Sequence, residues 1–214
     1  GKVEVVDNGS DFAGNIPVEQ LRRSARDKLR LPSDEFMFLF VGQHIWEKNL
    51  EFLLEALAEI RTLPFRMYFI GSGYAASELR RKTEDLYLTD KVIFMGSITE
   101  RERLKLYYAA ADLFLFPSLY DNAPLVVREA AALHTPSLLI KGSTSAEVIH
   151  DSVNGFLSDN SVTAYASRIS QLLETPQLIA EAGEAASHSI ARSWEDVAEE
   201  VYDRYVNLIH RSGN

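Results

Sequence analysis

The stretch Leu113-Phe-Leu-Phe116, followed by Pro117-Ser-Leu-Tyr-Asp121-Asn-Ala-Pro-Leu-Val-Val-Arg-Glu129-Ala-Ala-Ala132, decides the fold class of this chain. Four consecutive apolar residues predict a strand buried on both faces, as in a parallel sheet covered by helices. The Ala-rich sequence after the loop predicts a helix. The loop between strand and helix then lies at the sheet edge where open α/β proteins bind ligands.

The same alternation of apolar runs and helical segments continues in both directions from this unit. The expected strands are 36–41, 66–71, 92–95, 113–116 and 137–140, and the segments that follow them are 49–60, 77–86, 100–110, 125–132 and 145–150. Because parallel strands are joined by right-handed crossovers, this order predicts an α/β fold with a Rossmann-like parallel sheet and helices on both faces. One sheet accounts for residues 34 to about 158.

The two flanks of the chain differ from this pattern. Residues 1–33 are expected to form an interdomain linker followed by a surface helix at Val18–Arg30, and residues 34–190 the Rossmann-like domain. Apolar residues at helical spacing predict terminal helices at 162–173 and 194–209, with Ser193 as the N-cap of the second. A C-terminal helix therefore occupies residues 191–214.

Composition limits the possible functions. The 214 residues are 46% hydrophobic and 25% charged, with a net charge of −9 that disfavours nucleic-acid binding as the main task. With no Cys, the chain has neither disulfides nor thiol chemistry, which fits a reducing compartment, and cytoplasm is the expected location. No apolar run is long enough to span a bilayer, and the polar start is not a signal peptide.

Asp121 and Glu129 lie on either side of an expected helix start near Pro124. Proline is tolerated in the first turn of a helix, so Asp121 precedes the helix and Glu129 lies in its second turn. The unpaired N–H groups and positive dipole end between them suit a diphosphate, and the carboxylates suit sugar and ribose hydroxyls. The alternative is an Asp near a helix N-terminus and a surface Glu without function.

A second loop at a strand end supports the functional interpretation. Phe40-Val-Gly42 ends a strand, and a polar loop leads to Lys48. Gly42 would let a ligand approach the backbone, and Lys48 would place an ammonium on a phosphate. An exposed Lys near a helix start is the alternative.

Other chemical motifs are weak. Gly71-Ser-Gly73-Tyr-Ala-Ala76 fits the dinucleotide fingerprint, but the next strand is not followed by the acidic residue that NAD binding requires, so we interpret Gly71 and Gly73 as a tight turn near the ligand. The five His residues lack metal-ligand spacing, and Ser118 lacks the glycines of a nucleophile elbow. No cofactor or metal is expected.

Taken together, these segments resemble glycosyltransferase family 4, retaining enzymes of the GT-B fold that use sugar nucleotides. The matching pieces run in order along the chain: 5–11, 40–42, Glu47-Lys48, 69–73, 91–96, 107–112, 116–118, Asp121 to Glu129, Thr135-Pro136 and 154–157. Their order and spacing are more specific than any one piece.

The resemblance implies roles for individual residues. Asp121 takes the first acidic position of the family's Glu-x7-Glu motif, which contacts the transferred sugar; Glu129 takes the second, which binds the ribose; and Lys48 binds phosphate. The remaining nucleotide-sugar contacts that we expect are Gly42, Gln43, Gly71, Gly73, Ser97 and Ile98 near the base, Asn122, Ala123, and the backbone N–H groups of Leu125 and Val126.

The chain also departs from the family pattern. Gln43 replaces an arginine and removes a cation from the diphosphate site, Asp121 is one methylene shorter than Glu, and Pro124 removes one N–H donor. His134 stands where the family has a Gly, and we expect it to adopt a left-handed conformation. These departures imply weaker stabilisation of the phosphates or a preference for a different sugar.

The resemblance covers only the second half of a GT-B enzyme. We therefore expect a donor-binding domain that acts with a missing N-terminal acceptor-binding domain, through which any membrane contact would occur, and that is inactive in transfer by itself. The expected donor is a UDP- or GDP-sugar, and the acceptor is a glycan, a lipid or a small molecule. Two alternatives stay open: a non-catalytic module with a degenerate site, and half of a sugar-nucleotide epimerase.

Overall fold

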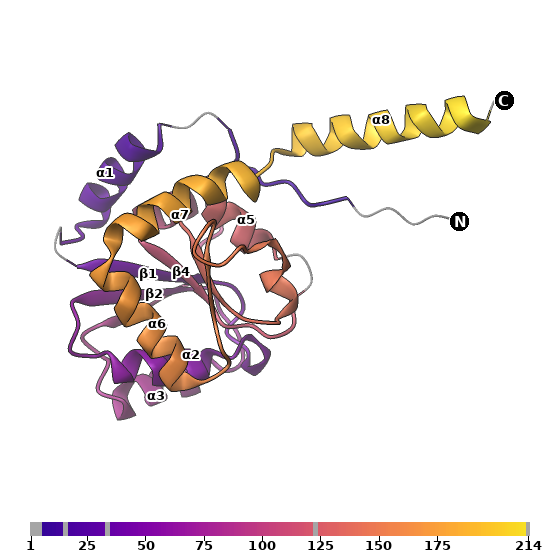
Figure 1. The fold of residues 1–214 in the computed structure, drawn as a ribbon. Helices are drawn as coiled ribbons and strands as arrows, with labels where there is room; N and C mark the ends of the chain where they lie inside the picture. Colours follow the sequence, from indigo (N-terminus) through magenta and orange to yellow (C-terminus); the bar gives the residue numbers. More distant parts are fainter. Residues whose placement is uncertain (1–5, 15–16, 33–34, 122–123, 213–214) are drawn as a thin grey trace.

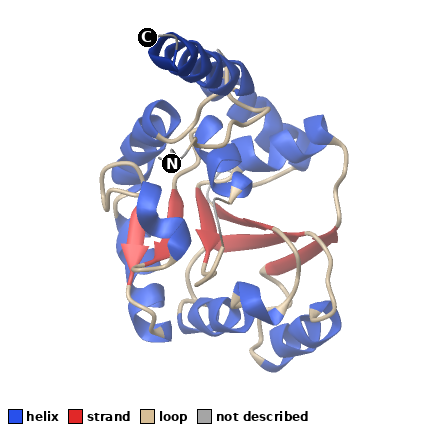
Figure 2. Ribbon diagram, turned by 90° about the vertical axis from the view of Figure 1, so that its right-hand side faces the viewer, coloured by secondary structure: helices blue, strands red, loops and turns tan. Residues whose placement is uncertain are grey.

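A six-stranded parallel sheet forms the centre of the molecule (Figure 2). The computed structural model describes residues 6–14, 17–32, 35–121 and 124–212. The strands are β1 (Phe36–Val41), β2 (Phe65–Ile70), β3 (Val92–Gly96), β4 (Leu113–Phe116), β5 (Ser137–Ile140) and β6 (Phe156–Ser158). Their spatial order is β3-β2-β1-β4-β5-β6, and every pair is parallel. The predicted fold class is confirmed.

Helices cover both faces of this sheet (Figure 1). One face carries α2 (Leu50–Glu59), α3 (Ala76–Asp85) and α6 (Val162–Glu174), and the other carries α1 (Val18–Leu29), α4 (Arg101–Ala110), α5 (Leu125–Ala132) and α7 (Pro176–Ser189). Each layer buries an apolar helix face against strands that are themselves apolar, which is why the strands read as continuous hydrophobic runs.

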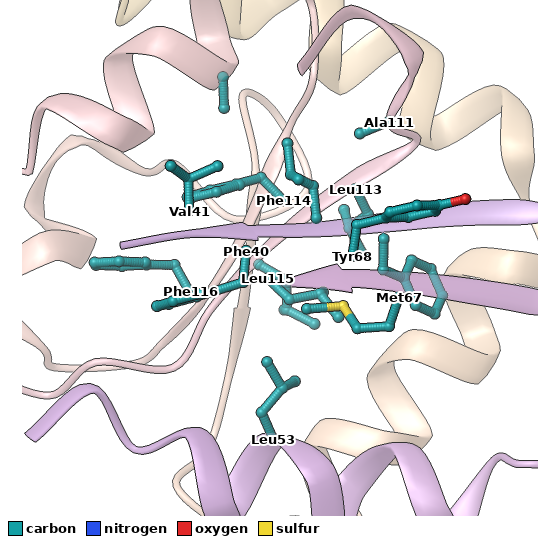
Figure 3. Close-up of a cluster of buried hydrophobic side chains, with 14 of the residues drawn as sticks. Phe40, Val41, Leu53, Met67, Tyr68, Ala111, Leu113, Phe114, Leu115 and Phe116 are labelled. Carbon is teal, nitrogen blue, oxygen red and sulfur yellow. The ribbon is translucent and has the colours of Figure 1, made fainter. Parts of the chain in front are cut away.

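The core is built mainly from the two central strands, β1 and β4. Phe40 and Phe116 stack with ring centroids 5.9 Å apart, and Leu53 of α2 approaches the same layer from below the sheet (Figure 3). All four residues of β4 are buried, as are five of the six in β1. The two strands that lead to the candidate ligand loops are thus buried along almost their whole length.

Most element boundaries agree with the sequence prediction, and three differ. The segment predicted at 145–150 is only a 3-10 turn, Thr144–Val148, and a short strand, β6, follows it. Between α6 and α8, Pro176 begins a further helix, α7. The 3-10 turn and β6 are too short to show a clear hydrophobic periodicity.

The last helix, α8 (Trp194–Ser212), extends away from the domain (Figure 1). Ser193 is confirmed as its N-cap: the Ser193 hydroxyl accepts the Asp196 amide at 3.0 Å, and the Asp196 carboxylate accepts the Ser193 amide at 2.9 Å. This is a reciprocal capping arrangement.

The strand order creates a switch point between β1 and β4. From β1 the chain moves outward through β2 and β3, and then returns to the other side of β1 as β4. Loops that follow the two strands at a switch point diverge, and the crevice between their ends is where open α/β sheets bind ligands. The loops after Val41 and after Phe116 border this crevice.

Candidate functional site

The switch-point crevice brings together the two loops that the sequence singled out. The ammonium of Lys48, in the 3-10 turn Trp46–Lys48, forms an ion pair with the carboxylate of Asp121. The side-chain amide of Asn49 donates to the carbonyl of Pro117 at 3.4 Å, which joins the same loops a second time. Asn49 has φ 56°, a left-handed conformation that asparagine tolerates. Residues more than seventy positions apart therefore form one site.

Asp121 is held in place by the loop after β5. Its amide donates to the hydroxyl of Thr144 at 2.8 Å, and that hydroxyl donates to the Asp121 carbonyl at 3.0 Å. The Ser145 hydroxyl reaches the same carbonyl at 3.4 Å. Thr144 was not among the residues expected from the sequence, although its position just after a buried strand was a signal that could have found it.

Lys48 is the cation of this crevice. Its side chain is mostly buried, and the ammonium also lies 5.6 Å from the centroid of the Phe116 ring. With Asp121 as its partner, the pair has no net charge. An anionic ligand must therefore share Lys48 with Asp121, or displace Asp121, in order to bind. A sugar hydroxyl that donates a hydrogen bond to Asp121 leaves the ion pair intact.

The start of α5 adjoins Asp121. Pro124 is the N-cap residue and Leu125 begins the helix, which places Glu129 in the second turn as predicted. The amide of Val127 bonds to the Pro124 carbonyl, whereas those of Leu125 and Val126 have no partner within the part of the chain that the structure describes. Asn122 and Ala123 lie outside the described residues.

The Glu129 side chain is bonded to two residues of α4. Its side chain is almost fully buried, and both oxygens accept hydrogen bonds: Oε1 from Arg101 at 2.8 Å and Oε2 from the Tyr108 hydroxyl at 2.9 Å. Burial and the adjacent carboxylate raise the pKa of Tyr108 well above its usual value, so Tyr108 remains a hydrogen-bond donor. Neither Arg101 nor Tyr108 was among the site residues expected from the sequence.

The loops after β2 and β3 pack against the loop after β1. The amide of Gly71 donates to the Gly96 carbonyl at 2.9 Å, and the amide of His44 donates to the Ser72 carbonyl at 3.0 Å. A Cβ on Gly71 would lie 1.8 Å from the Gly42 oxygen, and one on Gly73 would lie 2.3 Å from the His44 oxygen. Both glycines are required by this close packing of loops.

The remaining predicted contacts lie on the same sheet edge. Ser97 is exposed and its hydroxyl donates to that of Ser72 at 2.8 Å; Ile98 is half-buried; and Gln43 is exposed. The space beside Gly42 in the Cβ direction is occupied by the Phe40 ring at 3.1 Å. His134, far from this edge, has φ 57°, so its predicted left-handed conformation is confirmed.

His44 is buried between the site loops and the aromatic core. Its ring lies among those of Phe40, Phe69 and Phe94, with centroids about 6 Å away, and Nε2 has no hydrogen-bond partner among the described residues. Burial, together with the positive charge of Arg80, lowers the pKa of His44 to about 4. The imidazole is neutral at neutral pH.

This histidine is expected to make the protein sensitive to mild acid. Above pH 6.5 His44 is neutral in both folded and unfolded chains and contributes nothing. As pH falls from about 6.5 to 4, only the unfolded chain gains the proton, so the free energy of unfolding decreases by up to about 3 kcal/mol. Urea denaturation across this pH range should show a smaller loss of unfolding free energy for His44→Phe than for the wild type. The control His150→Gln, at an exposed site, should lose as much as the wild type. Equal pH slopes for all three would contradict the assignment.

Within the described ranges, no helix is long and apolar enough to cross a membrane. Nor does the same part of the chain hold a cluster of three or more His, Asp or Glu side chains that could bind a metal ion. A cavity of about 390 Å³ opens at the opposite, amino-terminal edge of the sheet, beside Phe36 and Asp112. It is remote from the switch-point crevice.

Comparisons with known proteins agree with this geometry. The family model described as "Glycosyl transferases group 1" matches residues 22–189. D-inositol 3-phosphate glycosyltransferase 2 of Catenulispora acidiphila is 31% identical over 222 residues, covering 98% of this chain and 51% of the relative.

Two solved structures share the architecture. Sucrose-phosphate synthase of Thermosynechococcus elongatus has 25% identity and a TM-score of 0.81, covering 96% of this chain and 52% of that one. Anabaena HepE, solved in complex with UDP and glucose, has 21% identity and a TM-score of 0.79, covering 95% and 56%. The chain thus spans about half the length of each of these proteins.

Proposed function

Because the chain belongs to the glycosyl transferases of group 1, we propose that it is the donor-binding half of a retaining family 4 hexosyltransferase. The donor is a UDP- or GDP-sugar, and the acceptor is a glycan, a lipid or a small molecule. One observation carries this proposal: Lys48 and Asp121 meet at the switch point of the sheet, beside the N-terminus of α5.

Different site residues bind different parts of the sugar-nucleotide donor. The diphosphate lies against the start of α5, where the helix dipole and the amides of Leu125 and Val126 favour negative charge. The Lys48 ammonium weakens its ion pair with Asp121 and stabilises the negative charge that develops on the departing diphosphate. Asp121, freed from full ion pairing, accepts hydroxyl hydrogen bonds from the sugar and orients it for attack from the same face.

The nucleoside lies toward β3. Glu129 accepts the ribose hydroxyls, and Ser97 and Ile98 border the base in the loop just before Arg101. The contacts of Glu129 with Arg101 and Tyr108 support this role, since they fix the carboxylate while each oxygen retains a lone pair for a further donor.

Residues 34–190 are the proposed nucleotide-sugar-binding domain, preceded by the linker and helix and followed by the C-terminal helix. The relatives are about twice as long as this chain, which supports an acceptor-binding domain in the whole enzyme. Transfer by the isolated domain is therefore not expected. The absence of Cys supports a cytoplasmic setting.

A non-catalytic module is the second candidate, and the neutral Lys48–Asp121 pair favours it, because a closed pair resembles a degenerate phosphate site. Transfer assays on the full-length parent distinguish the two. Activity that is lost in Lys48→Ala would reject the non-catalytic module, and release of an isomerised sugar without acceptor would instead indicate an epimerase.

Binding of nucleotides to the domain tests the pair directly. We expect Lys48→Ala to weaken both UDP and UDP-sugar about tenfold, since one charge-assisted phosphate contact is lost. Asp121→Asn should instead strengthen bare UDP severalfold by releasing Lys48, yet weaken the UDP-sugar relative to UDP. Calorimetry with UDP, GDP and their sugars measures these affinities.

Lys28→Ala, which removes an exposed lysine of α1, is the charge-matched control and should bind as the wild type does. If no sugar nucleotide binds to the wild-type domain, and the full-length parent is also inactive, the proposed function is wrong.

A further inference from the structure

Arg101 connects the candidate ribose carboxylate to the N-terminal linker. One of its guanidinium nitrogens donates to Glu129 Oε1 at 2.8 Å, and the other lies 3.2 Å from Asp11 Oδ2. The guanidinium carbon also lies 4.2 Å from the centroid of the Phe12 ring. A single side chain thus bridges two carboxylates and covers an aromatic ring, a combination that a planar guanidinium permits.

Phe12 contacts both Arg101 and Tyr108, the two residues that are bonded to Glu129. Its side chain is only 2% exposed and meets the Tyr108 ring edge-on, with centroids 5.9 Å apart. The Tyr108 hydroxyl donates to Glu129 Oε2 at 2.9 Å. Glu129 is therefore linked to Phe12 indirectly by two routes, one through Arg101 and one through Tyr108.

Residues 6–14, which we call the linker segment, are also attached to neighbouring elements. Arg128, the residue before Glu129, donates to Asp7 at 2.7 Å and to the Ile190 carbonyl at 2.9 Å. The amide of Ser10 donates to the Arg192 carbonyl at 2.8 Å. The segment therefore lies against α5 and the end of α7, and Arg101 contacts it at Asp11 and Phe12.

We infer that Arg101 is a positioning residue that couples Glu129 to the linker segment. A change in how firmly Glu129 is held is transmitted through Arg101 to Asp11 and Phe12, and the reverse holds equally, because coupling between two sites is reciprocal. The nucleotide part of this inference rests on the proposed function. A ribose that occupies the free lone pairs of Glu129 fixes Arg101 and thereby orders the linker segment.

The unliganded protein tests the coupling by hydrogen exchange. The amides of Ser10, Phe12 and Ala13 are hydrogen-bonded and should be protected. In Arg101→Ala we expect their exchange to be about threefold to tenfold faster, from loss of one partly exposed ion pair and one cation–π contact. Arg101→Lys retains the charge but cannot bridge the two carboxylates and stack on the ring. Its exchange rates should lie between those of the wild type and Arg101→Ala.

Glu129→Gln should also increase exchange at these amides, but by a smaller factor in an Arg101→Ala background, because only the route through Tyr108 then remains. Arg103→Ala, an exposed arginine two positions away on α4, is the control and should leave exchange unchanged. Equal exchange in Arg101→Ala, Arg101→Lys and Arg103→Ala would overturn the inference, whatever the protein binds.

A second arm uses UDP as the probe. UDP should slow amide exchange in the linker segment by a few-fold. By reciprocity, Asp11→Asn, a change outside the site, should weaken UDP binding by the factor with which UDP stabilises the linker contact. If UDP binds equally to the wild type, Asp11→Asn and Arg101→Lys, the coupling is wrong and the proposed function stands. If UDP and UDP-sugars do not bind at all, the proposed function fails, and the exchange data on the unliganded protein still decide the coupling.

Discussion

Replacing Glu129 with alanine is expected to weaken UDP- or GDP-sugar binding by about a hundredfold or more. In the proposed site two ribose hydroxyls would lose a charged acceptor, and each hydrogen bond to a charged group contributes about 1.5–3 kcal/mol. Because the carboxylate is already oriented by Arg101 and Tyr108, ligand binding requires little reorganisation of this side chain. Calorimetry on the domain, with the intact nucleotide sugar and with the bare nucleotide, measures the loss, which should be similar for both.

Stability must be measured on the same samples. Glu129→Ala leaves the hydroxyl of fully buried Tyr108 without its acceptor, which costs about 1–3 kcal/mol of folding free energy. Glu129→Gln retains an acceptor for Tyr108 and should fold better, while still losing at least tenfold in affinity. Glu102→Ala, an exposed carboxylate on α4, is the control. Wild-type affinity in both Glu129 variants would show that the ribose is bound elsewhere.

Replacing Gly71 with alanine should have the largest effect on stability. The new methyl group would lie 1.8 Å from the Gly42 oxygen, and φ at this position is 138°. The contact is with backbone, and both loops are anchored by hydrogen bonds between Gly42 and Ile70 and between Gly71 and Gly96, so neither can move aside without loss. We expect the free energy of unfolding to fall by more than about 4 kcal/mol, a loss typical of severe steric conflict.

Gly142→Ala separates the steric conflict from backbone strain. Gly142 also has a positive φ, 80°, but a Cβ there would meet nothing within 4 Å. Its cost should be about 1 kcal/mol, the strain term alone. Urea denaturation of the two variants gives the difference. Similar losses for both would mean that the loops after β1 and β2 can separate easily, contrary to the packing seen here.

The fold was largely predictable because its signals are local. The runs at Phe36–Val41, Leu113–Phe116 and Ser137–Ile140 are apolar on both faces, so burial on both sides follows from the residues themselves, and the structure confirms their bounds. The start of α5 and the cap at Ser193 were likewise predictable, since each depends on a few adjacent residues.

The site was predictable only in its constituents. Sequence position identified Lys48, Asp121 and Glu129 as candidates, but an ion pair across 73 positions depends on β4 lying beside β1, and no local pattern specifies strand order. The partners of Glu129 come from α4, whose rotation about its own axis is set by packing against α1 and α5. The requirement for glycine at position 71 likewise arises from the approach of another loop.

The amino-acid sequence by itself thus determined the class of fold, the strand-end loops and the identity of the charged groups, because hydrophobic periodicity and helix-start chemistry act over a few residues. Only the tertiary structure decided which groups meet: Lys48 with Asp121, and Glu129 with Arg101 and Tyr108. The physical reason is that side-chain contacts over long sequence separations depend on how whole strands and helices pack, and that packing is a property of the complete core.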